Sequence, residues 1–350
     1  MKFIDAWWFN NLQEDCNIPQ PNFFTPKSHI GVYAELEKIE LPFSLLVYAK
    51  ASDGKILYSN NYNIITSESC EKYEIEIDPQ MGIFIFKALT DTLSVLPDSI
   101  YIVYKDKKTE YAQTKKCEYS TLSGKINDFN GNLFQSPLLL YRVAFDGKNS
   151  YMGVWSDKDG KYQITVPNGT YNAFYLDDDS YNKTTLECWG WHMIVDQNEE
   201  INFKIGNGEV YSLHTWPSNG GFSTLFIYFR PMILPSLKHS TYTVDLNEGF
   251  KVTDISPDLE LKDLNISVNN HKCEVISLQR IYETSSDKKS MPAYIVQVNK
   301  YCGSIHVGKQ TLCVEYNNQK RKDIDKNVIL AQSQGYMQFF YKDSCATCIK

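Results

Sequence analysis

Residues 122–171 contain three segments that indicate the fold: LSGKINDFNG (122–131), SPLLLY (136–141) and SDKDGKYQITVPNGTY (156–171). In the first segment, Leu122, Gly124 and Ile126 alternate with polar neighbours, which is the period-two pattern of a half-buried strand. Turn residues such as Asn130 and Gly131 follow, and both tolerate positive φ angles at little cost. Short strands at this spacing predict an antiparallel β-sandwich.

The turn and strand residues of this stretch also match those of a known family. The matching residues are Gly124, Asp128, Gly131, Pro137, Leu138, Asp157, Gly160, Tyr162, Val166, Pro167, Gly169 and Tyr171. The chain therefore resembles the carboxypeptidase regulatory-like, or transthyretin-like, β-sandwich family over roughly residues 122–205. It departs from the family pattern at Leu139-Leu140-Tyr141, where a small residue is common. That family is mostly non-catalytic and accompanies other domains, so the resemblance implies a binding or scaffolding module.

The remainder of the 350-residue chain has the same strand-like character on both sides of this stretch. Hydrophobic alternation with Gly, Asn and Pro punctuation continues to the C-terminus, and no long amphipathic helix is indicated. We expect an all-β, multidomain chain of antiparallel β-sandwiches with a central transthyretin-like module. The expected units are an N-terminal β-sandwich domain (1–119), the carboxypeptidase regulatory-like β-sandwich (120–206) and a C-terminal β-rich domain (207–350).

Composition limits the classes of partner. The net charge of −7 argues against a general nucleic-acid surface, because phosphate binding needs a basic field. No run of 18 apolar residues is present, which predicts no membrane span, and the N-terminus lacks the pattern of a secretory signal. The nine cysteines are an odd number without framework spacing, so a reduced, cytoplasmic setting is expected.

Aromatic residues supply the candidate binding site. The four candidate ligand-binding residues are Trp155, Trp189, Trp191 and Trp216. Aromatic faces with a few polar groups suit a sugar ring or an apolar small molecule. The alternative is that these tryptophans simply fill sandwich cores.

Two histidines lie beside the tryptophans in the sequence and could supply chemistry. The candidate catalytic residues are His192 and His214, with an acid from Asp177 or Asp179, because an imidazole near a carboxylate can act as acid or base. A regular strand would place Trp189, Trp191 and Met193 on one face and His192 on the other. A site that used both sets would need a bulge or a second strand.

Metal and cofactor signatures are weak. Cys345 and Cys348 have the spacing of a zinc or redox half-site, but no partner pair exists. His271 and Glu274 match a His-x-x-Glu spacing, yet they lie across a turn into an expected strand. No nucleophile elbow, phosphate loop or dinucleotide fingerprint is present, so the sequence predicts no metal and no cofactor.

The sequence favours a non-catalytic binding or scaffold protein with an aromatic-lined site for a small molecule or carbohydrate. The first alternative is an enzyme without a recognised motif, which would use His192 or His214 with a nearby Asp in an aromatic pocket. The second is an interaction platform that recruits a protein partner through exposed sheet edges.

Overall fold

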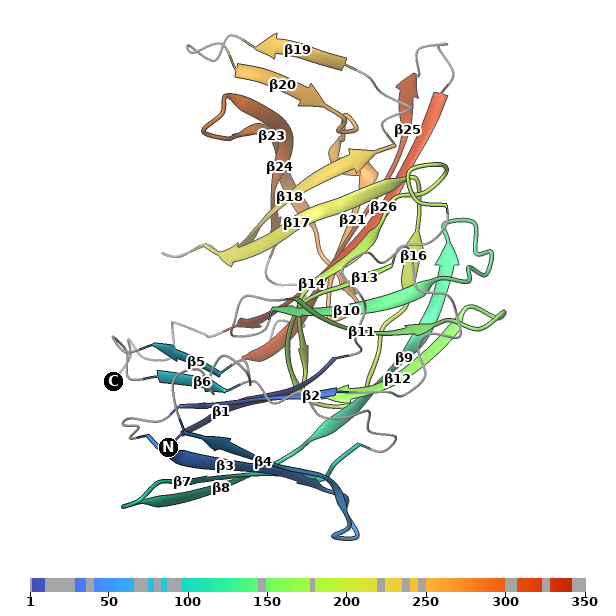
Figure 1. Cartoon of the computed structure of the whole chain (residues 1–350). Helices are drawn as coiled ribbons and strands as arrows, with labels where there is room; N and C mark the ends of the chain where they lie inside the picture. Colours follow the sequence, from blue (N-terminus) through green and yellow to red (C-terminus); the bar gives the residue numbers. More distant parts are fainter. Residues whose placement is uncertain are drawn as a thin grey trace, which may run out of the picture.

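A computed structural model gives the fold of most of the chain (Figure 1). It describes residues 2–9, 29–35, 41–65, 75–78, 83–86, 96–143, 149–176, 180–218, 224–234, 240–244, 250–299, 307–322 and 328–341. Almost all regular structure in these ranges is β, and the one helical element described is a single 3-10 turn, η2 (Leu261–Asp263). The prediction of an all-β chain built from several antiparallel sheets is confirmed.

The N-terminal part contains one four-stranded sheet and two separate strand pairs. The sheet has the order β4 (Ile56–Ile64), β3 (Phe43–Lys50), β7 (Ser99–Lys105), β8 (Glu110–Lys116). The pairs are β1 (Lys2–Phe9) with β2 (His29–Glu35), and β5 (Ile75–Asp78) with β6 (Ile83–Phe86).

The stretch quoted above forms strands of two sheets. One sheet contains β12 (Lys161–Pro167), β9 (Tyr119–Asp128) and β15 (Glu199–Glu200), with β16 (Phe203–Ile205) also paired to β9. The other has eight strands in the order β11 (Asn149–Trp155), β10 (Pro137–Val143), β13 (Gly169–Leu176), β14 (Cys188–Val195), β26 (Val328–Tyr341), β25 (Gly308–Lys322), β21 (Leu264–Val268), β22 (His271–Lys272).

A further sheet covers the C-terminal half of the eight-stranded one. Its order is β17 (Gly208–Pro217), β18 (Thr224–Ile233), β24 (Lys289–Asn299), β20 (Phe250–Asp254), β19 (Ser240–Val244), with β23 (Val275–Thr284) also paired to β24. Figure 1 shows β25 and β26 running obliquely from this sheet to the central strands. Four pairings are parallel rather than antiparallel: β14 with β26, β15 and β16 with β9, and β20 with β24.

The sandwich motif residues have clear structural roles. Leu122 and Ile126 are buried as their alternation predicts. Between them, Gly124 leaves room for the Ile201 carbonyl oxygen, which a Cβ atom would approach to 2.0 Å. Gly160 closes its turn with a φ of +67°, and the Tyr171 hydroxyl donates a hydrogen bond to the Pro167 carbonyl oxygen at 2.8 Å. These contacts support a β-sandwich, while its transthyretin-like identity stays a prediction.

The described residues contain two hydrophobic cores, and the domain division expected from the sequence stays a prediction. The first joins buried residues of β3 and β7 to residues of β9–β16, so it continues across residue 119. The second lies between β17, β18 and β24 on one side and β21, β25 and β26 on the other. The pairing of β14 with β26 carries one sheet across residue 206.

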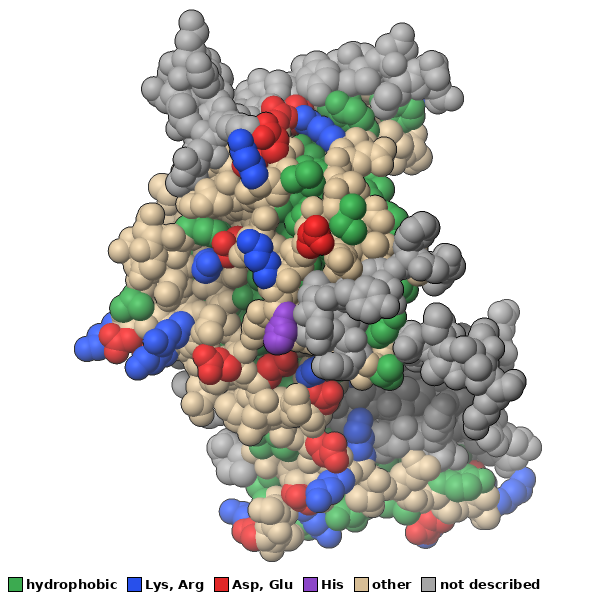
Figure 2. Space-filling model, turned by 180° about the vertical axis from the view of Figure 1, so that it is seen from behind, with side chains coloured by type: hydrophobic (Ala, Val, Ile, Leu, Met, Phe, Trp, Pro, Cys, Tyr) green, Lys and Arg blue, Asp and Glu red, His purple; other side chains and the backbone are tan. Residues whose placement is uncertain are grey.

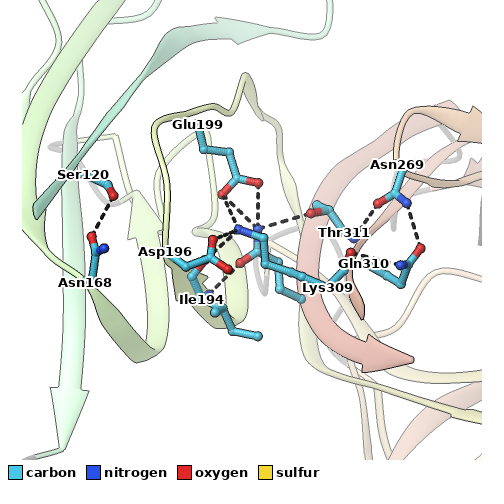
Figure 3. Close-up of polar contacts among 10 residues, drawn as sticks. Ser120, Asn168, Ile194, Asp196, Glu199, Asn269, Lys309, Gln310 and Thr311 are labelled. Atoms are coloured by element: carbon cyan, nitrogen blue, oxygen red, sulfur yellow. Dashed lines mark hydrogen bonds and ion pairs between the residues drawn. The ribbon is translucent and has the colours of Figure 1, made fainter. Parts of the chain in front are cut away.

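A polar network fixes the C-terminal strands to the turn after β14 (Figure 3). The Lys309 ammonium on β25 lies 2.5 Å from an Asp196 carboxylate oxygen, 3.1 Å from the Ile194 carbonyl oxygen and 3.5 Å from Glu199. From β26, the Gln338 amide donates to Glu199 at 3.0 Å and accepts the Ile194 backbone N–H. Because backbone groups and charges are satisfied together, the network holds β14, β25 and β26 in one register.

Candidate functional site

Four aromatic side chains meet where β14 faces β17. Trp189 and Trp191 stack with ring centroids 4.7 Å apart, and Tyr175 of β13 stacks on Trp189 at 4.9 Å. Tyr211 of β17 contacts both indoles edge-on, at 5.6 Å and 5.1 Å. All four side chains are half-buried. We call Tyr175, Trp189, Trp191 and Tyr211 the aromatic cluster.

The cluster lies on the face of the eight-stranded sheet opposite the first core. Cys188 and Phe174 point into that core, so by strand alternation Trp189 and Tyr175 project from the other face. Leu139 on β10 and Ala173 on β13 share this outer face, and both are buried without belonging to either core. The outer face therefore carries apolar residues of its own, and the cluster residue Trp191 packs there against the second core.

Local irregularities bring the histidines to the same place. His192 has a φ of +51°. The alternation of inward- and outward-facing side chains along β14 is interrupted there, so that Met193 faces inward and lies beside Gly190. In β17, Ser212 has a φ of +55° and the register with β18 shifts between Tyr211 and His214. As a result the His192 and His214 rings lie 5.9 Å apart. These are the bulge-type features that the sequence pattern required for a joint site.

One expectation about side-chain direction is corrected. A regular strand would have put Met193 with the tryptophans and His192 away from them. Instead Met193 is buried in the first core, whereas Trp191 and His192 both contact residues of β17. The reason is the left-handed backbone at His192, which breaks the two-residue period of the strand.

Charged groups that the sequence did not single out border the cluster. The Trp189 indole N–H donates to a Glu187 carboxylate oxygen at 3.1 Å. The Arg230 guanidinium lies over the Tyr211 ring, 4.9 Å from its centroid. Glu209 is 3% exposed, and its Oε1 atom has no hydrogen-bond partner among the described residues. The Nε atom of Arg230 likewise lacks a partner within the described part of the chain.

Burial controls the ionisation of Glu209. Loss of hydration raises the pKa of its carboxyl group from 4.5 to about 8, and the negative charge of Glu187 acts in the same direction. The Trp189 indole and the Arg230 guanidinium oppose the shift without cancelling it. Glu209 is therefore mainly protonated and uncharged at neutral pH.

The backbone around Glu209 is held by Tyr316 of β25, which is fully buried. Its hydroxyl accepts the Glu209 N–H at 3.1 Å and donates to the Met232 carbonyl oxygen at 2.7 Å. Gly208 has no side chain because a Cβ atom would lie 2.1 Å from that hydroxyl. Strand β17 begins at Gly208, and the contact with Tyr316 places Glu209 against the second core.

We expect Tyr316→Phe to lower the free energy of unfolding by about 2 kcal/mol, since it leaves the buried Glu209 N–H and Met232 carbonyl without their common partner. Urea denaturation followed by circular dichroism measures this loss. Tyr111→Phe is the control, because Tyr111 is exposed and should tolerate the change. Equal stability of the two variants would contradict the role given to Tyr316.

The other sequence-predicted residues lie elsewhere. Trp216 is 42% exposed and stacks on Phe226 in the β17–β18 hairpin, at a centroid distance of 5.7 Å. Trp155 lies on β11, an edge strand of the eight-stranded sheet. Asp177, Asp179 and the Cys345–Cys348 pair fall outside the described residues. His271 begins the short strand β22 and is exposed.

No metal centre is indicated by the described side chains, because no three His, Cys, Asp or Glu residues in those ranges gather around one point. No helix in the described ranges is long and apolar enough to span a membrane. Figure 2 shows acidic and basic side chains interspersed on the face it presents.

Comparisons with known proteins establish no family for this chain. No family model matches the chain, and no curated protein matches it. Among solved structures, BcpA, the major pilin subunit of Bacillus cereus, is 9% identical over 63% of this chain and 69% of that chain, with a TM-score of 0.19.

Two further pilus proteins are similar at the same level. The full-length major pilin SpaD from Corynebacterium diphtheriae is 9% identical over 64% of this chain and 66% of that chain, with a TM-score of 0.22. The group B streptococcus pilus 2b backbone protein is 10% identical over 54% and 97% of the two chains, with a TM-score of 0.18. These TM-scores are too low to establish a common fold or to transfer a function.

Proposed function

We propose that the chain is a non-catalytic binding or scaffold protein, and that its aromatic cluster holds a small carbohydrate-like molecule. The observation that carries the proposal is Glu209, whose carboxyl group is buried with an unpartnered oxygen among the described residues, directly beside half-buried aromatic rings. An unsatisfied buried polar group costs about 1–3 kcal/mol, and such groups call for a specific explanation. A ligand hydroxyl or amine would supply the missing partner.

The chemistry of the cluster suits a sugar. Indole and phenol rings offer apolar contact to the C–H face of a sugar ring, while Glu187, Glu209 and Arg230 offer acceptors and donors for its polar substituents. Arg230 is also held in place, because its guanidinium lies 3.5 Å from a Glu283 carboxylate oxygen. The polar groups therefore stand in fixed positions around the rings.

We expect Trp191→Ala to weaken binding of short β-1,4-linked glucose and glucosamine oligomers at least tenfold, because stacked indole area is lost. Isothermal titration calorimetry measures the affinity, and Trp216→Ala is the matched control on the separate Trp216–Phe226 stack. Unchanged affinity in Trp191→Ala, or no binding of any oligomer to the wild type, would contradict the proposal.

The enzyme alternative has one observation in its favour, the proximity of His192 and His214. Partial burial and the neighbouring His214 lower the pKa of His192, so it would be a neutral base near pH 7. Analysis of the oligomers after these calorimetric titrations decides between the two functions. Oligomers recovered intact support a binding protein, whereas cleavage that disappears in His192→Ala would support the enzyme.

Two accompanying expectations are part of the proposal. A protein partner could add to an edge strand such as β8 or β11, both of which end their sheets. A reducing, cytoplasmic location fits the buried free thiol of Cys188.

A further inference from the structure

Among the described residues, acidic groups outnumber basic groups beside the aromatic cluster. In this part of the chain, the Arg230 cation lies near Glu209 and Glu283, and Glu187 lies near Glu209. That cation is already engaged, because it pairs with Glu283 at 3.5 Å and stacks over Tyr211 at 4.9 Å. The Glu283 carboxylate also accepts a hydrogen bond from the Tyr228 hydroxyl. Within the described residues, the Oε1 atom of Glu209 and the Nε atom of Arg230 are left without a hydrogen-bond partner.

From this arrangement we infer that the site selects ligands that carry an ammonium group, so that among carbohydrates it takes amino sugars. The inference rests on the proposed function and names the ligand class of the same site. An ammonium group would lie between the Glu209 and Glu187 carboxyl groups, beside the aromatic cluster. Carboxylates and aromatic faces both attract a cation, and the attraction is stronger where water is excluded.

Ligand binding removes one proton from Glu209. In the free protein Glu209 holds a proton because burial of its carboxyl group and the charge of Glu187 outweigh the opposing effects of Trp189 and Arg230. When R–NH3+ enters, the Glu209 O–H bond breaks, the proton leaves to solvent, and an R–NH3+ to carboxylate ion pair remains. A ligand that arrives as R–NH2 accepts that proton directly and gives the same ion pair. No oxidant or other reactant is needed.

The other titratable groups facing Glu209 do not replace this partner. Glu187 lies just before β14 and accepts the Trp189 indole N–H. On β25, the Tyr316 hydroxyl is occupied by the Glu209 backbone and the Met232 carbonyl. Arg230 on β18 and Glu283 on β23 are paired with each other. An added cation would compensate an ionised Glu209 without breaking any of these contacts.

Three tetrasaccharides that differ only at C2 test the inference: β-1,4-linked glucose, N-acetylglucosamine and glucosamine. Titration calorimetry at pH 5.5, where the glucosamine amines are mainly protonated, in two buffers with different ionisation enthalpies gives both the affinity and the number of protons released. We expect glucosamine tetramer to bind at least tenfold more tightly than glucose tetramer and to release close to one proton. Equal affinities for all three, or no proton release, would overturn the inference while leaving the proposed function intact.

Two variants test whether Glu209 causes the ligand preference and the proton release. Glu209→Gln should lose both the tenfold preference and the proton release, while it still binds the glucose tetramer. Glu200→Gln removes the same charge from an exposed position on β15 and should behave as wild type. A preference that survives in Glu209→Gln would overturn the inference, and no binding of any tetramer to the wild type would overturn the proposed function itself. Circular dichroism confirms that each variant is folded.

Discussion

Glu209→Gln is expected to stabilise the protein above pH 8 by on the order of 4 kcal/mol, while the two proteins differ little at pH 4. The reason is that glutamine resembles the protonated acid, which is the form that the buried site accepts. Ionised Glu209 must stay in a poorly hydrated position beside Glu187, so each unit of pH between its ordinary pKa and about 8 favours the unfolded chain.

The direction follows from the two pKa values of this group. The carboxyl group has a pKa of 4.5 when unfolded and about 8 when folded, so between these values the folded state holds a proton that the unfolded state has lost. Its contribution to the free energy of unfolding therefore falls as pH rises from 4.5 to about 8 and is constant above that. Urea denaturation at pH 5, 7 and 9 measures this, with Glu200→Gln as control. Parallel pH profiles for wild type and Glu209→Gln would contradict it.

Gly206→Ala should lower the free energy of unfolding by about 3 kcal/mol, because there is no room for a side chain at this position. An added Cβ atom would lie 2.1 Å from the Gln332 carbonyl oxygen of β26, and backbone cannot move aside as a flexible side chain can. Next to it, the Asn207 side chain accepts the Gln332 N–H at 3.0 Å. The variant would thus separate the β16–β17 connection from β26.

Gly190→Ala is the matched control for this change. Its Cβ atom would lie 3.1 Å from the sulfur of Met193, a flexible side chain, so a smaller loss is expected. Thermal and urea denaturation of both variants measure the difference. If Gly206→Ala were as stable as Gly190→Ala, the close packing of residues 206–207 on β26 would be wrong.

The strands of the sandwich could be predicted because their signals are local. Leu122 and Ile126 alternate with polar residues, and the Asn130-Gly131 and Gly160 turns need only the backbone freedom of those residue types. The neighbouring positions of Trp189 and Trp191 on one strand face followed from the same period. These features depend on residues a few positions apart.

The candidate site could not be predicted in full because it depends on distant pairings. β14 meets β26 through Trp189 and Gly335, which no local pattern indicates. His192 and Ser212 have positive φ angles, which are uncommon for residues other than glycine. The sequence therefore did not indicate the change of side-chain direction at these positions. Two signals were available: Glu209 and Arg230 are isolated charges within strongly apolar strand sequences, a pattern that indicates buried polar groups.

The domain division stays a prediction, because its signals were turns and polar runs. A polar run near residue 110 and the Asn207-Gly208 turn suggested boundaries, but turns occur within sheets as well as between domains. The first core joins β3 and β7 to the central strands, and the eight-stranded sheet includes strands from both sides of residue 206. Strand pairing over such distances depends on the whole fold and is not encoded in turn residues.

The central claim is that Glu209 is buried and protonated beside the aromatic cluster, with its Oε1 atom unpartnered among the described residues, and its carboxyl carbon can be observed directly. Carbon-13 NMR of protein labelled at glutamate, titrated from pH 3 to 10, follows each carboxyl group, and the signal absent from Glu209→Gln identifies the residue. A midpoint near pH 8 is predicted. A midpoint near 4.5, the ordinary value for a hydrated glutamate, would contradict the account.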